Sequence, residues 1–155
     1  MKKMMRRTAL VLFMALVSAF AVISAQTPEA LVDLVRRHAA DSSVVVSYKM
    51  EVLEDGKLTK DAGVLEAQDA LWHLKGSSVE IYTDAQATWI LDPDAKEAVV
   101  EPAWTYSDLL DFYESLMKMG VAVDVQVTSM HTGAKRPVSE FTPSCGPDWV
   151  VTDLR

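Results

Sequence analysis

SVEIYTDAQATWILDPDAKEAVVE, residues 78–101, is the part of the sequence that says most about the fold. It contains three short apolar runs separated by two turns, at Thr83-Asp84-Ala85 and at Asp92-Pro93-Asp94. Short runs rich in Val, Ile, Thr, Trp and Tyr and bounded by Asp and Pro are typical of consecutive antiparallel strands. We therefore expect three strands here, joined by tight turns.

The first of these turns determines which side chains share a face of the sheet. A two-residue turn would place Val79 and Ile81 on the face opposite Trp89 and Leu91, whereas a three-residue loop would place all four on one face. Because burying one wide apolar face is favourable, we expect the three-residue loop. Its last residue, Ala85, is then expected in the left-handed conformation.

A long hairpin is predicted upstream of this stretch. Residues 44–54 alternate between apolar and polar side chains, and Asp55-Gly56 is the strongest two-residue hairpin signal in the chain. Pairing through this turn sets Tyr48 beside Gly63, and a glycine opposite an aromatic ring lets a sheet bend. We expect a curved hairpin, followed by a further strand over residues 70–75.

Two helices are predicted to cover the sheet. The first runs from the cap residue Thr27 to about Ala40 and carries an apolar stripe. The second is expected to begin at the cap residue Ser107 and to end at Met119, before Gly120. Its apolar belt consists of Leu109, Leu110, Phe112, Tyr113, Leu116, Met117 and Met119. So broad a belt exceeds what packing on one sheet face requires.

The C-terminal part of the chain predicts a mixture of strand and loop. Residues 121–128 alternate again, residues 136–141 are compatible with a short strand, and residues 149–154 are expected to form a last strand. The segment 131–147 is rich in Gly, Pro, Ser and Thr, so most of it is expected to be loop.

The beginning of the sequence predicts a secretory signal peptide over residues 1–25. Four basic residues precede the apolar run 9–23, which ends in Ser24-Ala25-Gln26. We expect cleavage after Ala25, with Ala19-Phe20-Ala21 as the alternative. The residue directly after either cut is not a cysteine, so the mature chain is expected to be exported without a lipid of its own. Residues 26–155 are expected to form one domain.

Composition and side-chain spacing exclude several classes of function. The chain of 155 residues has a net charge of −7, which argues against nucleic acid and against anionic lipid headgroups as partners. Cys145 is the only cysteine, so the core must hold together by burial alone. The three histidines, His38, His73 and His131, lack ligand spacing, and no serine lies in a recognisable nucleophile turn. We expect a non-enzyme that needs no metal or cofactor.

The run V-E-I-Y-T-D-A-Q-A-T-W-I-L-D-P, preceded by Gly63-Val64-Leu65 and Leu71-Trp72, resembles the periplasmic outer-membrane lipoprotein carriers, the LolA-like family. The similarity covers residues 44–101 and is closest to short, divergent members. Its most specific part is D-x-x-x-x-W-x-x-D-P, from Asp84 to Pro93. The resemblance implies an α+β fold in which a curved antiparallel sheet forms an incomplete β-barrel covered by α-helices.

The same resemblance implies a periplasmic chaperone that binds lipoprotein acyl chains in an apolar cavity and carries them toward the outer membrane. It would receive acylated lipoproteins from an inner-membrane ABC-type exporter and release them to an outer-membrane acceptor. We expect a monomer. The predicted cavity lining consists of Val46, Tyr48, Met50, Leu65, Trp72, Leu74, Val79, Ile81, Trp89, Leu91, Leu109, Phe112 and Leu116.

Two alternatives stay open at this point. The same fold can serve as a lipid- or lipoprotein-sensing regulatory module, and the apolar faces can simply form a dry core. The sequence also departs from the family in one respect. Better-known carriers have a basic residue followed by Pro that latches the helical lid, whereas this chain has Gln68-Asp69-Ala70 in the corresponding stretch. The resemblance therefore does not carry that latch over.

Overall fold

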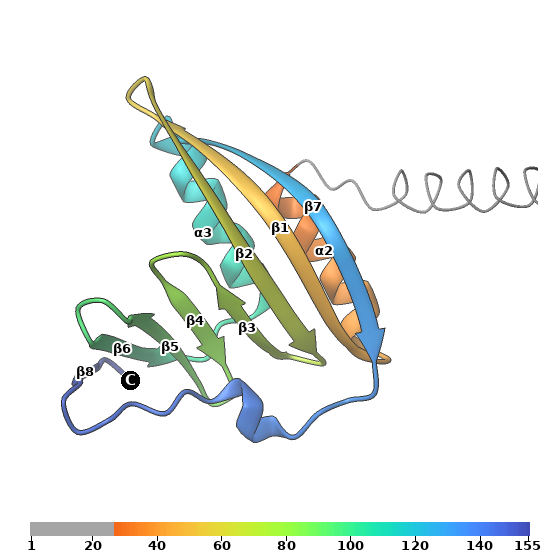
Figure 1. Ribbon diagram of the computed structural model, residues 1–155, viewed down its shortest axis with the longest axis vertical. Helices are drawn as coiled ribbons and strands as arrows, with labels where there is room; N and C mark the ends of the chain where they lie inside the picture. Colours follow the sequence, from red (N-terminus) through yellow and green to blue (C-terminus); the bar gives the residue numbers. More distant parts are fainter. Residues whose placement is uncertain (1–26) are drawn as a thin grey trace, which may run out of the picture.

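The computed structural model describes residues 27–155, and the predicted signal peptide lies outside them. Within residues 27–155, two α-helices, eight strands and one short 3-10 helix follow one another (Figure 1). Their order and bounds are α2 (Pro28–Ala39), β1 (Ser43–Glu54), β2 (Lys57–Gln68), β3 (Leu71–Lys75), β4 (Glu80–Thr83), β5 (Ala87–Asp92), β6 (Glu97–Pro102), α3 (Tyr106–Lys118), β7 (Ala122–Gly133), η1 (Val138–Phe141) and β8 (Val150–Asp153).

The strands form one open sheet in the order β7-β1-β2-β3-β4-β5-β6-β8. All neighbouring pairs are antiparallel except β6 and β8, which run parallel. The long strands β1, β2 and β7 curve visibly, and α2 and α3 lie behind the sheet in this view (Figure 1). The α+β class and the curved sheet are confirmed. We call the face covered by the two helices the inner face and the opposite one the outer face.

The long hairpin has the predicted register. Glu54 pairs with Lys57 across the Asp55-Gly56 turn, in which both turn residues have positive φ. Tyr48 therefore lies directly opposite Gly63, and a methyl group at Gly63 would come within 2.5 Å of the Tyr48 hydroxyl oxygen. The aromatic ring fills the space that the glycine leaves free, which is how the hairpin bends without a gap.

The turn between β4 and β5 differs from the prediction. Tyr82 pairs with Trp89, and the Asp84 N–H donates to the carbonyl of Ala87 at 3.3 Å, so the turn has two central residues, Ala85 and Gln86. The expected three-residue loop is wrong. Ala85 does have the expected positive φ, 70°, but as the first central residue of a two-residue turn, where a type II′ turn requires it.

The side chain of Asp84 stabilises this tighter turn. Its carboxylate accepts hydrogen bonds from the backbone N–H groups of Gln86 and Ala87, each at 3.0 Å. Asp side chains in turns commonly accept hydrogen bonds from the backbone two residues further along the chain. These bonds lower the pKa of Asp84, although burial opposes them. The shorter turn places Trp89 and Leu91 on the outer face, opposite Ile81.

We predict that Ala85→Gly will leave stability unchanged or raise the free energy of unfolding by up to about 0.5 kcal/mol. Glycine removes a left-handed strain of about 1 kcal/mol, and its greater freedom in the unfolded chain offsets part of this gain. Ala87→Gly is the control, because Ala87 is buried in a strand, and it should cost about 1 kcal/mol. Urea denaturation measures both changes, and equal losses would contradict the conformation assigned to Ala85.

Both helices begin with a side-chain cap. Thr27 caps α2 as predicted, since its Oγ1 accepts from Ala30 N at 3.2 Å. In α3 the cap is Thr105 rather than Ser107, because Thr105 and Asp108 form a reciprocal capping box. At the other end, the N–H of Val121 donates to the carbonyl of Leu116 at 3.1 Å, past Gly120 with its positive φ.

The segment between β7 and β8 covers the outer face. Residues 138–141 form the 3-10 helix η1 instead of the expected strand, and Phe141 is fully buried. With it, outer-face side chains of β3, β5 and β6 form a second buried apolar set: Leu71, Ala87, Leu91, Ala98 and Val100. Both faces of the sheet are therefore covered in part. The last strand is confirmed as β8.

Candidate functional site

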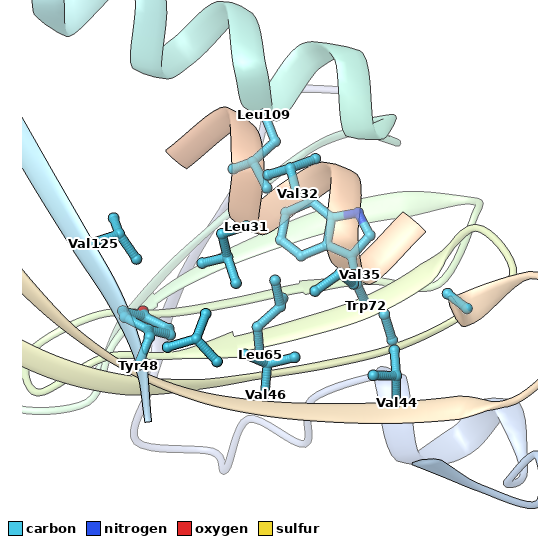
Figure 2. Packing of buried hydrophobic residues seen from close by; sticks show 13 residues of the cluster. Leu31, Val32, Val35, Val44, Val46, Tyr48, Leu65, Trp72, Leu109 and Val125 are labelled. Atoms are coloured by element: carbon cyan, nitrogen blue, oxygen red, sulfur yellow. The ribbon is translucent and has the colours of Figure 1, made fainter. Parts of the chain in front are cut away.

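The inner face carries the main core, and five of the predicted lining residues lie within it. Figure 2 shows these side chains between the sheet and the two helices, where Leu31, Val32 and Val35 of α2 meet Leu109 of α3. The predicted residues in this buried core are Val46, Tyr48, Leu65, Trp72 and Leu109. They pack as an interior layer, so in this part of the molecule the dry-core alternative describes the arrangement.

Three other predicted residues lie at the margin of this core. Met50, Leu74 and Ile81 are partly buried and pack against it. Leu74 and Ile81 are cross-strand partners in β3 and β4, and Ile81 is in turn the partner of Ile90 in β5. Ile90 shares its face with them and is also only partly buried. The apolar inner face therefore continues beyond the fully buried core.

Three of the predicted lining residues lie elsewhere: two are on the outer face, and one is exposed. Trp89 and Leu91 lie on the outer face because of the two-residue turn, and Leu91 is buried there. Val79 precedes β4 beside the Gly76–Val79 turn and is 39% exposed. The inner-face assignments of Trp89 and Leu91 were wrong, since both assumed the three-residue loop. Val79 is instead exposed because it lies in the turn before β4.

Helix α3 presents an apolar belt of which only Leu109 is buried. Phe112 and Met117 are 46% and 42% exposed, and Tyr113 and Leu116 are half-buried. Residues three and four apart on a helix are neighbours, so these four side chains form one continuous strip. The strip extends to Trp104, whose ring centroid is 6.1 Å from that of Phe112. We call Trp104, Phe112, Tyr113, Leu116 and Met117 the α3 apolar surface.

Trp104 fixes the N-terminal end of α3 to the sheet. Its backbone N–H donates to Oγ1 of the buried Thr88 at 2.8 Å, and its indole N–H donates to the carboxylate of Glu101 at 3.0 Å. Nearby, the Tyr106 hydroxyl donates to the carbonyl of Asp69 at 3.0 Å, and burial raises the pKa of Tyr106 to about 12. The N-terminal end of α3 is thus held by hydrogen bonds, whereas its second half is less buried.

Sequence reasoning did not single out Trp104 and Tyr106. The usable signal was local: Thr105-Tyr106-Ser107-Asp108 has the spacing of a capping box, which places the helix start two residues earlier than Ser107. A small cavity of about 160 Å³ lies beside this start, lined by Trp104, Thr105 and Tyr106 together with Ala70, Ala85 and Ala103.

Two larger cavities lie away from the α3 apolar surface. One, of about 650 Å³, is lined mainly by charged and polar side chains of β1, β2 and β7, among them Lys49, Glu51, Lys60 and Asp124. The other, of about 370 Å³, adjoins it through Lys49 and Ala62. Of the predicted lining residues, Met50 borders the first cavity and Tyr48 the second. The charged side chains around the first cavity suit polar groups better than acyl chains.

A polar cluster occupies the outer face under the segment 134–142. The ring of His73 stacks on that of Tyr82 with centroids 3.8 Å apart, and its Nε2 lies 3.5 Å from the Glu80 carboxylate. Burial lowers the pKa of His73, so the neutral ring is favoured. Arg136 forms ion pairs with Glu66 at 2.8 Å and with Glu140 at 3.0 Å. Of these contacts, the pair between Arg136 and Glu66 of β2 joins the C-terminal segment to the sheet.

Within residues 27–155 no group of three or more His, Cys, Asp or Glu side chains is placed to hold a metal ion. None of the helices in the described part of the chain is long and apolar enough to cross a membrane. No protein-family model matches the chain, and no curated protein matches it significantly.

Proposed function

We propose that the protein is a periplasmic carrier that binds the acyl chains of lipoproteins at the α3 apolar surface and delivers them toward the outer membrane. The single observation that carries this proposal is the exposure of Phe112 and Met117 on a helix with an otherwise continuous apolar belt. A helix that serves only as a cover for a core needs a narrower apolar stripe. The similarity of residues 44–101 to the LolA-like carriers supports the same proposal.

The arrangement of α3 offers a way to admit a chain. Leu109, Trp104 and the Thr105–Asp108 capping box hold the N-terminal end of the helix, whereas the second half makes fewer buried contacts. Such a segment opens more easily than a buried one. An acyl chain placed between α3 and the partly buried inner-face residues Ile81 and Ile90 would gain about 0.8 kcal/mol for each methylene removed from water.

The proposal places acyl chains at the margin of the core instead of in its centre. The fully buried Val46, Leu65 and Trp72 then form a floor that supports the surface, and Met50, Leu74 and Ile81 border it. Methionine side chains such as Met117 adapt to chains of different shape. Export by the signal peptide, cargo supply by an inner-membrane ABC-type exporter and release to an outer-membrane acceptor belong to the same proposal.

Binding of a palmitoylated peptide, measured by titration calorimetry, tests this function. The double variant Phe112→Gln and Met117→Gln should weaken binding at least tenfold, because each side chain contributes about 1.5–3 kcal/mol when fully buried. The melting temperature of this variant should stay close to that of the unchanged protein, because both side chains are exposed in the folded protein and contribute little to its core.

The matched control is the double variant Val150→Gln and Val151→Gln. Both valines are exposed on β8, at 63% and 46%, and they lie away from α3 at the other edge of the sheet. This variant should bind the peptide as the unchanged protein does. Equal weakening by the two double variants, or no binding by the unchanged protein, would argue for a helix that only covers a core.

A further inference from the structure

The free side of β7 is long and lacks most of the usual protection of an edge strand. β7 has 12 residues and pairs with β1 on one side. Within the described chain, no hydrogen bond joins its other side to another segment. Edge strands are usually protected by lysine, by proline, by a β-bulge or by being short. Residues 122–133 include neither lysine nor proline, and the one bulge lies in the middle of the strand. A second strand can therefore pair here.

A β-bulge in the middle of β7 changes which side chains face inward. Ser47 of β1 pairs with Ser129, and the next residue, Tyr48, pairs with Val127, so Thr128 is an extra residue. Val123, Val125 and Val127 face the inner side before the bulge. After it, the even-numbered Met130 and Thr132 face that side instead.

We propose that two copies of the protein pair antiparallel through β7 about a two-fold axis, forming one sheet across both. If β7 aligns over its full length with its own copy, Ala122 lies opposite Gly133 and every odd-numbered residue lies opposite an even-numbered one. In a regular strand this would oppose inner and outer side chains. The bulge removes this mismatch on both sides of the centre, where Val123 meets Thr132 and Val125 meets Met130, all inner residues, and only at the centre does Val127 meet the extra residue Thr128.

The resulting pairs are complementary in chemistry. Val125 lies opposite Met130 of the second copy on the inner face, and Gln126 lies opposite Ser129 on the outer face. Asp124, the only acidic residue of β7, lies opposite His131, the only imidazole of β7, which can donate an N–H to the carboxylate. Because of the two-fold axis each pair occurs twice, as in an isologous interface.

Helix α2 leaves room for this assembly. α2 packs on β1 and on both neighbours of β1, so it lies over β1 rather than over the edge. Across β1, β7 and their copies, the two α2 helices would be three strand spacings apart, about 14 Å. Packed helices lie about 8–10 Å apart, so the two helices would not collide. The proposed dimer differs from the monomer expected from the sequence.

The mass of the purified protein in solution tests the dimer, in the absence of lipid, so the result is independent of the proposed carrier function. Light scattering after size-exclusion chromatography should give twice the mass of one chain, falling toward one chain on dilution. The double variant Gln126→Glu and Ser129→Glu should need at least tenfold higher concentration to dimerise, because it opposes two pairs of carboxylates. Within one copy these positions face Lys49 and Ser47, so the fold tolerates the change.

The double variant Val150→Glu and Thr152→Glu, at the β8 edge, is the control and should dimerise as the unchanged protein does.

The register is tested by oxidation in a Cys145→Ser background. A mixture of Gln126→Cys and Ser129→Cys chains should form disulfide-linked pairs, and neither chain alone should do so. A single-chain mass at all concentrations, a dimer unaffected by the Gln126→Glu and Ser129→Glu change, or cross-linking of one cysteine variant with itself would overturn the proposal.

Discussion

Replacing Gly63 with alanine is expected to lower the free energy of unfolding by about 2–3 kcal/mol. The same change in an ordinary strand raises stability by about 0.5–1 kcal/mol, so the sign itself is informative. A Cβ at this position would lie 2.5 Å from the Tyr48 hydroxyl oxygen and 2.7 Å from both Tyr48 Cζ and the Lys75 carbonyl oxygen. Because Tyr48 is buried in the core, its ring cannot move aside without displacing its neighbours.

Gly133→Ala is the matched control, since a Cβ at Gly133 meets no atom within 4 Å. This change should leave stability unchanged or raise it slightly.

Tyr48→Leu provides a second test, because it removes the ring that the new methyl group meets. In a Tyr48→Leu background, Gly63→Ala should cost less than it does alone, and the remaining cost should come from the Lys75 carbonyl. Guanidinium denaturation of the four variants measures this coupling. Similar effects of Gly63→Ala and Gly133→Ala would contradict the packing.

The hairpin of β1 and β2 was predictable because its signals are local. Asp55-Gly56 specifies a two-residue turn, and once the turn is known the register of both strands follows from counting. Glu51 and Lys60 then oppose each other, and their side chains do pair at 3.1 Å. The two helix positions were predictable for the same reason, since capping residues and apolar periodicity act within a few residues.

The faces of β4 and β5 were not predictable from local sequence. A positive φ at Ala85 fits the observed two-residue turn and would equally fit a three-residue loop. The conformation of Ala85 therefore does not decide the register of the two strands. The prediction chose the loop that gathers all apolar side chains on one face. That reasoning fails because Phe141, more than forty residues further along the chain, covers the other face.

The candidate site shows a similar limit. Alternation correctly assigned Val46, Leu65 and Trp72 to the face that the helices cover. It could not distinguish residues under the helices from residues beside them, because this depends on where α3 lies across the sheet. Leu109 and Phe112 are three residues apart in one apolar belt, yet the first is buried and the second is 46% exposed. Only the three-dimensional arrangement separates core from surface here.

Phe141→Ala is expected to have the largest effect of any change considered, a loss of about 3–5 kcal/mol from the packing that holds residues 134–155 on the sheet. Phe141 has no exposed surface, and it lies in a segment otherwise rich in polar residues. The guanidinium carbon of Arg136 lies 5.6 Å from its ring centroid, while Arg136 itself pairs with Glu66. Loss of the ring therefore removes apolar burial and also weakens the support of an ion pair.

Hydrogen exchange locates this loss along the chain. If the C-terminal segment opens without the rest, protection should fall in residues 134–155 and stay high in β1 and β2. Val138→Ala is the control in the same 3-10 helix, because Val138 is 54% exposed, and it should change stability by less than about 0.5 kcal/mol. Comparable effects of the two substitutions would mean that η1 does not anchor the segment.

Tryptophan fluorescence then separates the two faces of the sheet. Trp89 lies on the outer face, and its indole nitrogen is inaccessible although it has no hydrogen-bond partner. Trp72 lies under the helices on the inner face. When Phe141→Ala loosens the segment, a chain that keeps only Trp89 should show red-shifted emission as water reaches the ring, and a chain that keeps only Trp72 should not. The three-residue loop would put both rings on one face. A red shift in both single-tryptophan chains would therefore support that register and contradict a second core on the outer face.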